Sequence, residues 1–294
     1  MALAVACPLP DGPIDFAQGR RGSDLLMTQT PLRIAAVSYL NAVPLVWGLV
    51  HGPQRERFRV EFMVPSRCAD ALREGSADAG VIPSIEYQRI EDLKVVPGLS
   101  VSSAGPVRSV LLISRRPAEQ VGSLALDISS RTSVCLVQLV LRCRYGVAPS
   151  LHPHAPNLPA MLHEHDAALV IGDPALASNL PGLFVYDLAD EWRAMTGLPF
   201  VFAFWGVRQE AASPEWVPMF QEAAAYAMAH LEEILPAESE RTGLPVSLIR
   251  SYLTENIDIS FGAKNLEGLE RFYALAQEQG LIERNKPVEF IAVK

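Results

Sequence analysis

The sequence lacks the patterns that mark several common classes of protein. Its four cysteines, at positions 7, 68, 135 and 143, form no C-x-x-C pair and no metal-site spacing, so we expect free thiols and no metal site. No apolar run approaches the roughly 18 residues of a membrane span. The net charge is −8 and no lysine or arginine run occurs, which argues against a nucleic-acid partner.

Motifs for the familiar cofactors and nucleophiles are missing as well. The chain has no G-x-S-x-G elbow, no G-x-G-x-x-G fingerprint and no P-loop. No obvious acid/base pair emerges either, since Glu86 could face solvent as easily as a cleft. The residues therefore predict neither a metal nor an organic cofactor.

What is present is the composition of a globular protein. The 294 residues are 49% hydrophobic and 20% charged, and the length suggests about two domains. Residues 1–31 differ, because they contain prolines and glycines and few periodic apolar positions. We predict that they form a disordered extension, with Met27 as an alternative natural start. Ala2–Cys7 superficially resembles a lipoprotein cleavage box, but it has no positive residues before it and is too short for a signal peptide.

The rest of the chain alternates short apolar runs with helical patterns, which argues for parallel sheets. We predict strands at 33–37, 58–63, 79–82, 95–101, 107–113, 124–126, 167–171 and 200–207, and helices at 41–49, 66–74, 84–89, 131–145, 174–179, 221–235, 245–255 and 266–279.

Two α/β units followed by a helical tail predict a two-lobed α/β fold with a ligand cleft between the lobes. In such a fold the chain crosses between the lobes twice, and we place the crossings near 114–117 and 203–208. The first lobe would then contain residues 32–114 and 206–294, and the second lobe residues 115–205.

Polar residues gather at the ends of several predicted strands, where ligands bind in open α/β sheets. Asn41 and Asp173 have a simpler alternative role, because each could cap the helix that follows it. The clusters are Ser38 to Asn41, Pro83-Ser84, Ser102-Ser103 with Gly105 to Ser109, Ser129 to Ser133, and Gly172-Asp173.

The run Ser129-Ser130-Arg131-Thr132-Ser133 carries the strongest signal. Hydroxyl groups at the start of a helix lie beside unpaired backbone N–H groups and the positive end of the helix dipole, which suits an anion. One hydroxyl would suffice as an N-cap, so four hydroxyls and an arginine favour a ligand site.

Six segments resemble chorismate dehydratase of the futalosine route to menaquinone, in the correct order over about residues 33–207. They are VSYLNAVPL (Val37–Leu45), GVIPSIEY (Gly80–Tyr87), GPVRSVLL (Gly105–Leu112), LDISSRTSV (Leu126–Val134), LVIGDPAL (Leu169–Leu176) and DEWRAMTGLPFVFAFW (Asp190–Trp205).

The resemblance implies a cytoplasmic enzyme with a type II periplasmic-binding-protein-like fold. Such an enzyme converts chorismate to 3-[(1-carboxyvinyl)oxy]benzoate and water without a metal or an organic cofactor. It implies that Asn41 and Ser109 lie closest to the chemistry and that Ser129–Ser133 hold a carboxylate. Ser38, Ser84, Gly172 and Asp173 complete the expected substrate-binding set.

The reaction removes a ring proton beside the enol ether and the neighbouring hydroxyl. No protein base stands out, and we hypothesise, as the resemblance to the family suggests, that the enolpyruvyl carboxylate of the dianionic substrate takes the proton. Two alternatives remain open at this point: a solute-binding protein for an organic anion, and the related 1,4-dihydroxy-6-naphthoate synthase, for which no convincing histidine base is found.

Overall fold

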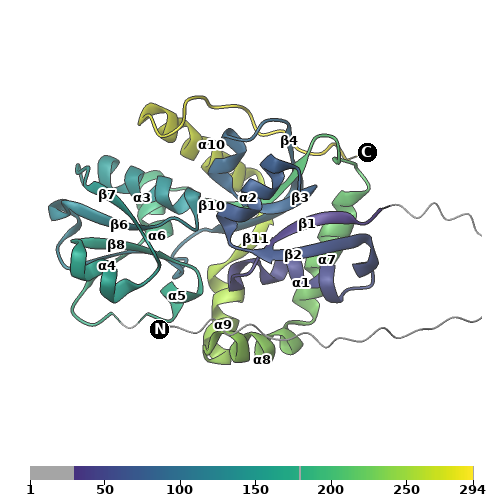
Figure 1. Cartoon of the computed structure of the whole chain (residues 1–294), viewed down its shortest axis with the longest axis horizontal. Coiled ribbons are helices and arrows are strands. Elements are labelled where there is room, and N and C mark those ends of the chain that lie inside the picture. Colours follow the sequence, from purple (N-terminus) through teal and green to yellow (C-terminus); the bar gives the residue numbers. More distant parts are fainter. Residues whose placement is uncertain (1–29, 179, 294) are drawn as a thin grey trace, which may run out of the picture. The chain divides into compact units, whose positions relative to one another are not determined.

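Two mixed β-sheets form the framework of the protein in the computed structural model, which describes residues 30–178 and 180–293 (Figure 1). Residues from Pro31 onward form one compact unit that contains both sheets. The disordered extension predicted for residues 1–31 falls almost wholly outside the described residues.

The first sheet contains β1 (Leu32–Val37), β2 (Phe58–Met63), β3 (Ala79–Pro83), β4 (Leu93–Ser103), β10 (Phe200–Arg208) and β11 (Asp258–Phe261). Their order is β11-β4-β10-β3-β1-β2. β1 runs parallel to β2 and β3, whereas β10 runs antiparallel to β3 and β4. β3 is buried at every position and β1 at all but one, as expected for strands covered on both faces.

The second sheet contains β5 (Val110–Ser114), β6 (Ser123–Asp127), β7 (Ser150–His154), β8 (Ala167–Ile171) and β9 (Phe184–Asp187). Their order is β7-β6-β8-β5-β9. β6 is parallel to β7 and β8, and β5 is antiparallel to β8 and β9. Both sheets are therefore mixed rather than purely parallel.

Helices cover the faces of both sheets (Figure 1). They are α1 (Val43–His51), α2 (Pro65–Glu74), α3 (Arg131–Cys143), α4 (Leu158–Glu164), α5 (Asp173–Leu176), α6 (Leu188–Thr196), α7 (Trp216–Ala229), α8 (Leu231–Thr242), α9 (Val246–Ser251) and α10 (Ala263–Glu278). In the first sheet α2 packs on β1 and β3 while α10 packs on β10, and in the second α3 and α4 pack on β8.

The two predicted crossings between lobes are displaced. β5 pairs with β8 and β9, so the chain leaves the first sheet over residues 104–109, not 114–117. It returns over residues 197–199, because β10 pairs along its length with β3 and β4. A buried strand is apolar whichever sheet it joins, so the run at 110–113 could not reveal its partner. We call residues 30–103 and 200–293 the first lobe and residues 110–196 the second lobe.

The helical tail is also more divided than its periodicity predicts. The helix expected over 221–235 is two helices, α7 and α8, which meet at His230. The helix expected over 245–255 becomes a π-helical turn, η5 (Tyr252–Asn256), directly after α9. Such turns are rare and occur often at functional sites.

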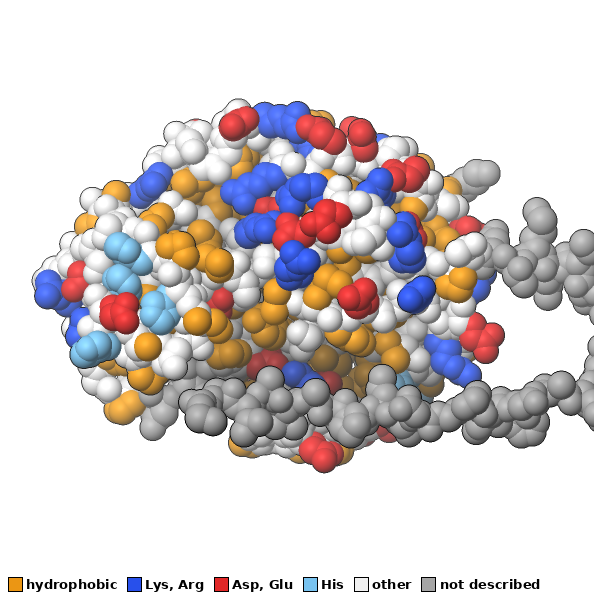
Figure 2. All heavy atoms as spheres, in the orientation of Figure 1, with side chains coloured by type: hydrophobic (Ala, Val, Ile, Leu, Met, Phe, Trp, Pro, Cys, Tyr) orange, Lys and Arg blue, Asp and Glu red, His pale blue; other side chains and the backbone are white. Residues whose placement is uncertain are grey.

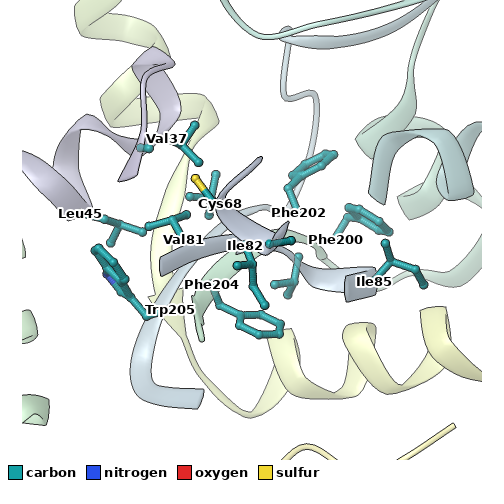
Figure 3. Close-up of a cluster of buried hydrophobic side chains, with 14 of the residues drawn as sticks. Val37, Leu45, Cys68, Val81, Ile82, Ile85, Phe200, Phe202, Phe204 and Trp205 are labelled. Atoms are coloured by element: carbon teal, nitrogen blue, oxygen red, sulfur yellow. The ribbon is translucent and has the colours of Figure 1, made fainter. Parts of the chain in front are cut away.

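The core between β3, β10 and the helices is built from large apolar side chains (Figure 3). Trp205 of β10 lies opposite Val81, and Phe204 lies opposite Ile82. Cys68 and Cys135 are free and buried, as expected, whereas Cys143 is free but exposed. This packed strand pair holds the strand ends that approach the second lobe.

Candidate functional site

A small cavity lies between the two lobes, at the ends of β1, β3, β4 and β8. The first lobe supplies Tyr39 and Asn41 to its wall, and the second supplies Ser130, Ser133 and Gly172. The volume is about 30 Å³, far below the roughly 300–1,000 Å³ of ordinary small-molecule sites. We call this space the inner cavity.

Asn41 lies in a short 3₁₀ turn, η1 (Leu40–Ala42), that links β1 to α1. It caps neither this turn nor α1, whose N-caps are Tyr39 and Ala42. Its Oδ1 atom is buried and has no hydrogen-bond partner among the described residues. Buried amide oxygens are normally bonded, so this atom is available to a ligand in the cavity.

Ser109 is fully buried and directly precedes Val110, which lines the inner cavity. Its hydroxyl accepts a hydrogen bond of 2.7 Å from the hydroxyl of Tyr252 in η5. Burial raises the pKa of Tyr252 well above its ordinary value, so this phenol stays protonated and remains a donor. The Ser109 proton is therefore free to point elsewhere.

The turn before Ser109 is held in a costly conformation. Arg108 has a φ of 64°, which is unfavourable for a side chain of this size. The carboxylate of Asp187 accepts hydrogen bonds from the N–H groups of Val107 (3.1 Å) and Arg108 (2.6 Å), which hold this turn in place. Strain maintained in this way is common at functional sites.

The Ser129–Ser133 run does not act as one cluster, because successive residues of a helix turn by about 100°. Ser130 caps α3 by accepting from Ser133 N–H, and both residues face the inner cavity. Ser129 and Arg131 lie on the other side, in a separate groove. Thr132 is fully buried against the first lobe.

Thr132 and Ser84 join the lobes behind the cavity. The Thr132 hydroxyl accepts from Ile85 N–H at 3.2 Å and lies 3.4 Å from Ser84 Oγ. Ser84 itself donates to the carbonyl of Val201. Both hydroxyls therefore have hydrogen-bond partners within the protein.

Arg131 is bound to carboxylates of the first lobe. It donates to Glu86 at 2.9 Å and to Asp70 at 3.0 Å. Glu86 is almost completely buried. Its burial would raise its pKa, but hydrogen bonds and charge from Arg89, Arg131 and Arg73 lower it below the ordinary value. This ion-pair network was not predicted, since Glu86 gave no sequence signal beyond its place after Ser84.

Gly172 and Asp173 join the lobes on another side. A Cβ on Gly172 would lie 3.0 Å from the Tyr39 ring, and the residue has a φ of 67°, so glycine fits best. Asp173 accepts from Leu40 N–H at 2.9 Å and pairs with Arg241 at 3.0 Å. Ser38 lies outside the inner cavity, in a different pocket beside Arg241.

Comparison with known proteins identifies the family. The family model described as menaquinone biosynthesis (VitK2_biosynth) matches residues 32–278. This chain belongs to the menaquinone biosynthesis family. The matched region of the family contains every residue that lines the inner cavity.

Two curated relatives are similar to this member of the menaquinone biosynthesis family. A chorismate dehydratase from Thermus thermophilus is 31% identical over 242 residues, which cover 76% of this chain and 87% of the relative. A chorismate dehydratase from Campylobacter jejuni is 27% identical over 243 residues, covering 80% and 93%.

Solved structures share the fold of this family member. A protein from Archaeoglobus fulgidus has a TM-score of 0.72 at 17% identity, covering 86% of this chain and 98% of its own. The periplasmic aliphatic sulphonate-binding protein SsuA from Escherichia coli has a TM-score of 0.62 at 19% identity, covering 91% and 96%. The two-lobed periplasmic-binding-protein-like fold is therefore confirmed.

In the part of the chain that the structure describes, no group of three or more histidine, cysteine, aspartate and glutamate side chains is placed to hold a metal ion. None of the helices in that part of the chain has the length and apolar character that crossing a membrane requires.

Proposed function

We propose that this protein is a chorismate dehydratase, a hydro-lyase that forms 3-[(1-carboxyvinyl)oxy]benzoate and water from chorismate. The observation that carries the proposal is the 31% identity, over 76% of this chain, to a relative of that name. The inner cavity supports it, because a buried amide oxygen that has no partner among residues 30–178 and 180–293 lies where the two lobes meet. We place the enzyme in the cytoplasm on the resemblance of its sequence to this family.

The inner cavity is too small for a ring with two carboxylates, so the lobes separate to admit the substrate. The contacts that must break include Leu40 N–H to Asp173, Ser84 to Thr132, and Arg131 to Glu86. When the lobes close again, water is excluded and the substrate is fixed in one orientation.

The chemistry follows from what the closed site can donate. The enolpyruvyl carboxylate of the substrate removes the ring proton, the neighbouring hydroxyl leaves while the ring becomes aromatic, and the carboxyl group returns that proton to the departing oxygen, which forms water. Ser109 receives a hydrogen bond from Tyr252, so its own O–H group can donate a hydrogen bond to the departing oxygen or to a carboxylate. The Asn41 amide holds the arm or the hydroxyl, because it both donates and accepts.

The carboxylates are held by the start of α3. Ser130 and Ser133 face the cavity beside the first N–H groups of this helix, whose dipole favours negative charge. Arg131, Thr132 and Asp173 have partners in the other lobe, so we assign them to lobe closure rather than to direct substrate contact. This division revises the uniform substrate-binding role that the sequence suggested for them.

Incubation of the purified protein with chorismate, followed by mass spectrometry, tests the proposal. We expect a product lighter than chorismate by one water, formed equally after treatment with a chelator. Binding of chorismate without turnover would instead favour a solute-binding protein for an organic anion. The substrate methylated on its enolpyruvyl carboxylate should bind and not react, and its normal turnover would refute substrate-assisted proton removal.

A further inference from the structure

A second and larger space opens on the outer side of the contact between the lobes. Its volume is about 800 Å³, within the range of small-molecule sites. The first lobe contributes Arg67 and Arg89 to its wall, and the second contributes Asp127, Ser129 and Arg131. We call this space the outer groove.

The outer groove and the inner cavity share a thin wall. In the first lobe, Val64 and Ser66 face the groove while Pro65 between them faces the cavity. In the second lobe, Ser129 and Arg131 face the groove while Ser130 faces the cavity. Two segments of three residues therefore separate the spaces.

Few hydrogen bonds close this wall. Ser66 N–H donates to the carbonyl of Ser129 at 2.9 Å, and the hydroxyls of Tyr39 and Ser129 lie 3.3 Å apart. Both wall segments are also helix starts, since α2 begins at Pro65 and α3 at Arg131. Separation of the lobes breaks these bonds and joins the groove to the cavity.

The groove carries positive charge in an acidic protein. Arg67, Arg89 and Arg131 line it against the single lining carboxylate of Asp127, whereas the whole chain has a net charge of −8. The same three arginines and Arg73 also pair with the carboxylates of Asp70 and Glu86. Charged side chains gather over α2 in Figure 2. Arg67 is 63% exposed and lies 3.6 Å from its carboxylate, so it is the arginine most accessible to an arriving anion.

Asp127 adds one carboxylate to the groove wall, and only one of its two oxygens accepts a hydrogen bond from the described residues. The residue is 1% exposed, and its Oδ1 accepts from Ser129 N–H at 2.9 Å. Its Oδ2 is buried without a hydrogen-bond partner among the described residues. An unpaired carboxylate oxygen beside arginines suits a ligand that has a hydroxyl as well as negative charge.

We propose that the outer groove is the entrance of the active site, where the arginines collect the hydroxylated dianionic substrate before the wall opens. The proposal deepens the proposed function and rests on it, because the dianion is the substrate assumed there. Local positive charge of this kind raises the association rate of anions by about 10-fold or more, and salt weakens the effect.

The test measures the association rate of the dianionic product by stopped-flow protein fluorescence, since product and substrate share the entrance. Arg67→Glu should slow association about 10-fold at low ionic strength and much less at about 1 M salt, where the Debye length is near 3 Å. Arg55→Glu is the matched control, because Arg55 is exposed next to β2, at the far edge of the first sheet, and the change in net charge is the same. Arg55→Glu should change the association rate by less than about twofold, which is well below the smallest effect, about 10-fold, expected of electrostatic steering.

A variant that makes the groove more positive distinguishes an electrostatic effect from damage to the fold. Asp127→Asn keeps the oxygen that accepts from Ser129 N–H and removes a negative charge, so product association should become faster at low salt. Equal rates for Arg67→Glu and Arg55→Glu, or a slowing by Arg67→Glu that salt does not relieve, would overturn the entrance. If the unaltered protein neither binds the product nor consumes chorismate, the proposed function is refuted, and the proposed entrance is refuted with it.

Discussion

Removal of the Tyr252 hydroxyl tests whether Tyr252 orients the hydroxyl of Ser109. This hydroxyl donates to Ser109 Oγ at 2.7 Å, and both side chains are buried. Tyr252→Phe removes one hydrogen bond and leaves Ser109 without its donor, which costs about 1–3 kcal/mol of stability. A preorganised donor at a reacting oxygen contributes about 10²–10³ in kcat. Because Tyr252 acts through Ser109, we expect a smaller loss in kcat, of about 10-fold.

Tyr87→Phe is the matched control for this substitution. The Tyr87 hydroxyl is also buried in the first lobe and lies away from the inner cavity; it donates to the carbonyl of Pro287 at 3.0 Å and accepts from Glu289 N–H at 2.9 Å. Tyr87→Phe removes two hydrogen bonds, so it should lose at least as much stability in thermal melts as Tyr252→Phe, but only Tyr252→Phe should lower kcat, with KM changed little. Equal kcat values in the two variants would refute a positioning role for Tyr252.

Three further predictions concern the contacts between the lobes. Burial opposes ionisation of Glu86, but its arginine partners lower its pKa, so the folded protein should lose stability as pH falls below about 4.5; thermal melts of Glu86→Gln should show a weaker dependence over the same range. Gly172→Ala should cost about 1–3 kcal/mol in denaturant unfolding, because a Cβ meets Tyr39 at a φ of 67°; an unchanged midpoint would refute this steric argument. Asp173→Ala should give a larger radius of gyration in small-angle scattering than the unaltered protein, since it removes the partner of Leu40 N–H and Arg241, and identical curves would contradict its role in closure.

The sequence predicted those parts of the fold that local patterns determine. The apolar runs at 79–82 and 167–171 are buried strands, because a strand covered on both faces must be apolar along its length. The short strands β9 and β11 were missed, since four residues carry too little pattern. The sheet that β5 joins depends on a partner more than 50 residues away, which no local pattern encodes.

The candidate site likewise combines residues that local sequence patterns indicate with residues that depend on contacts between distant parts of the chain. Asn41 and Ser130 both line the inner cavity, which local sequence could indicate because each follows a strand and precedes a helix; the catalytic role expected for Asn41 rests mainly on the family resemblance. Tyr252 was missed because its contact with Ser109 spans 143 residues of sequence. Arg131 was interpreted as a substrate ligand because its partners, Asp70 and Glu86, belong to elements whose approach to α3 only the tertiary structure reveals.

The kcat of Asn41→Ala at saturating chorismate tests the central claim most directly. The Asn41 Oδ1 atom has no hydrogen-bond partner among the described residues, so its removal should leave the melting temperature nearly unchanged. If this amide orients or stabilises the reacting substrate in the inner cavity, kcat should fall by about 10² or more. A variant that melts normally and still forms the product at the unaltered rate would contradict the account, because the unpaired group in the cavity would then have no part in the reaction.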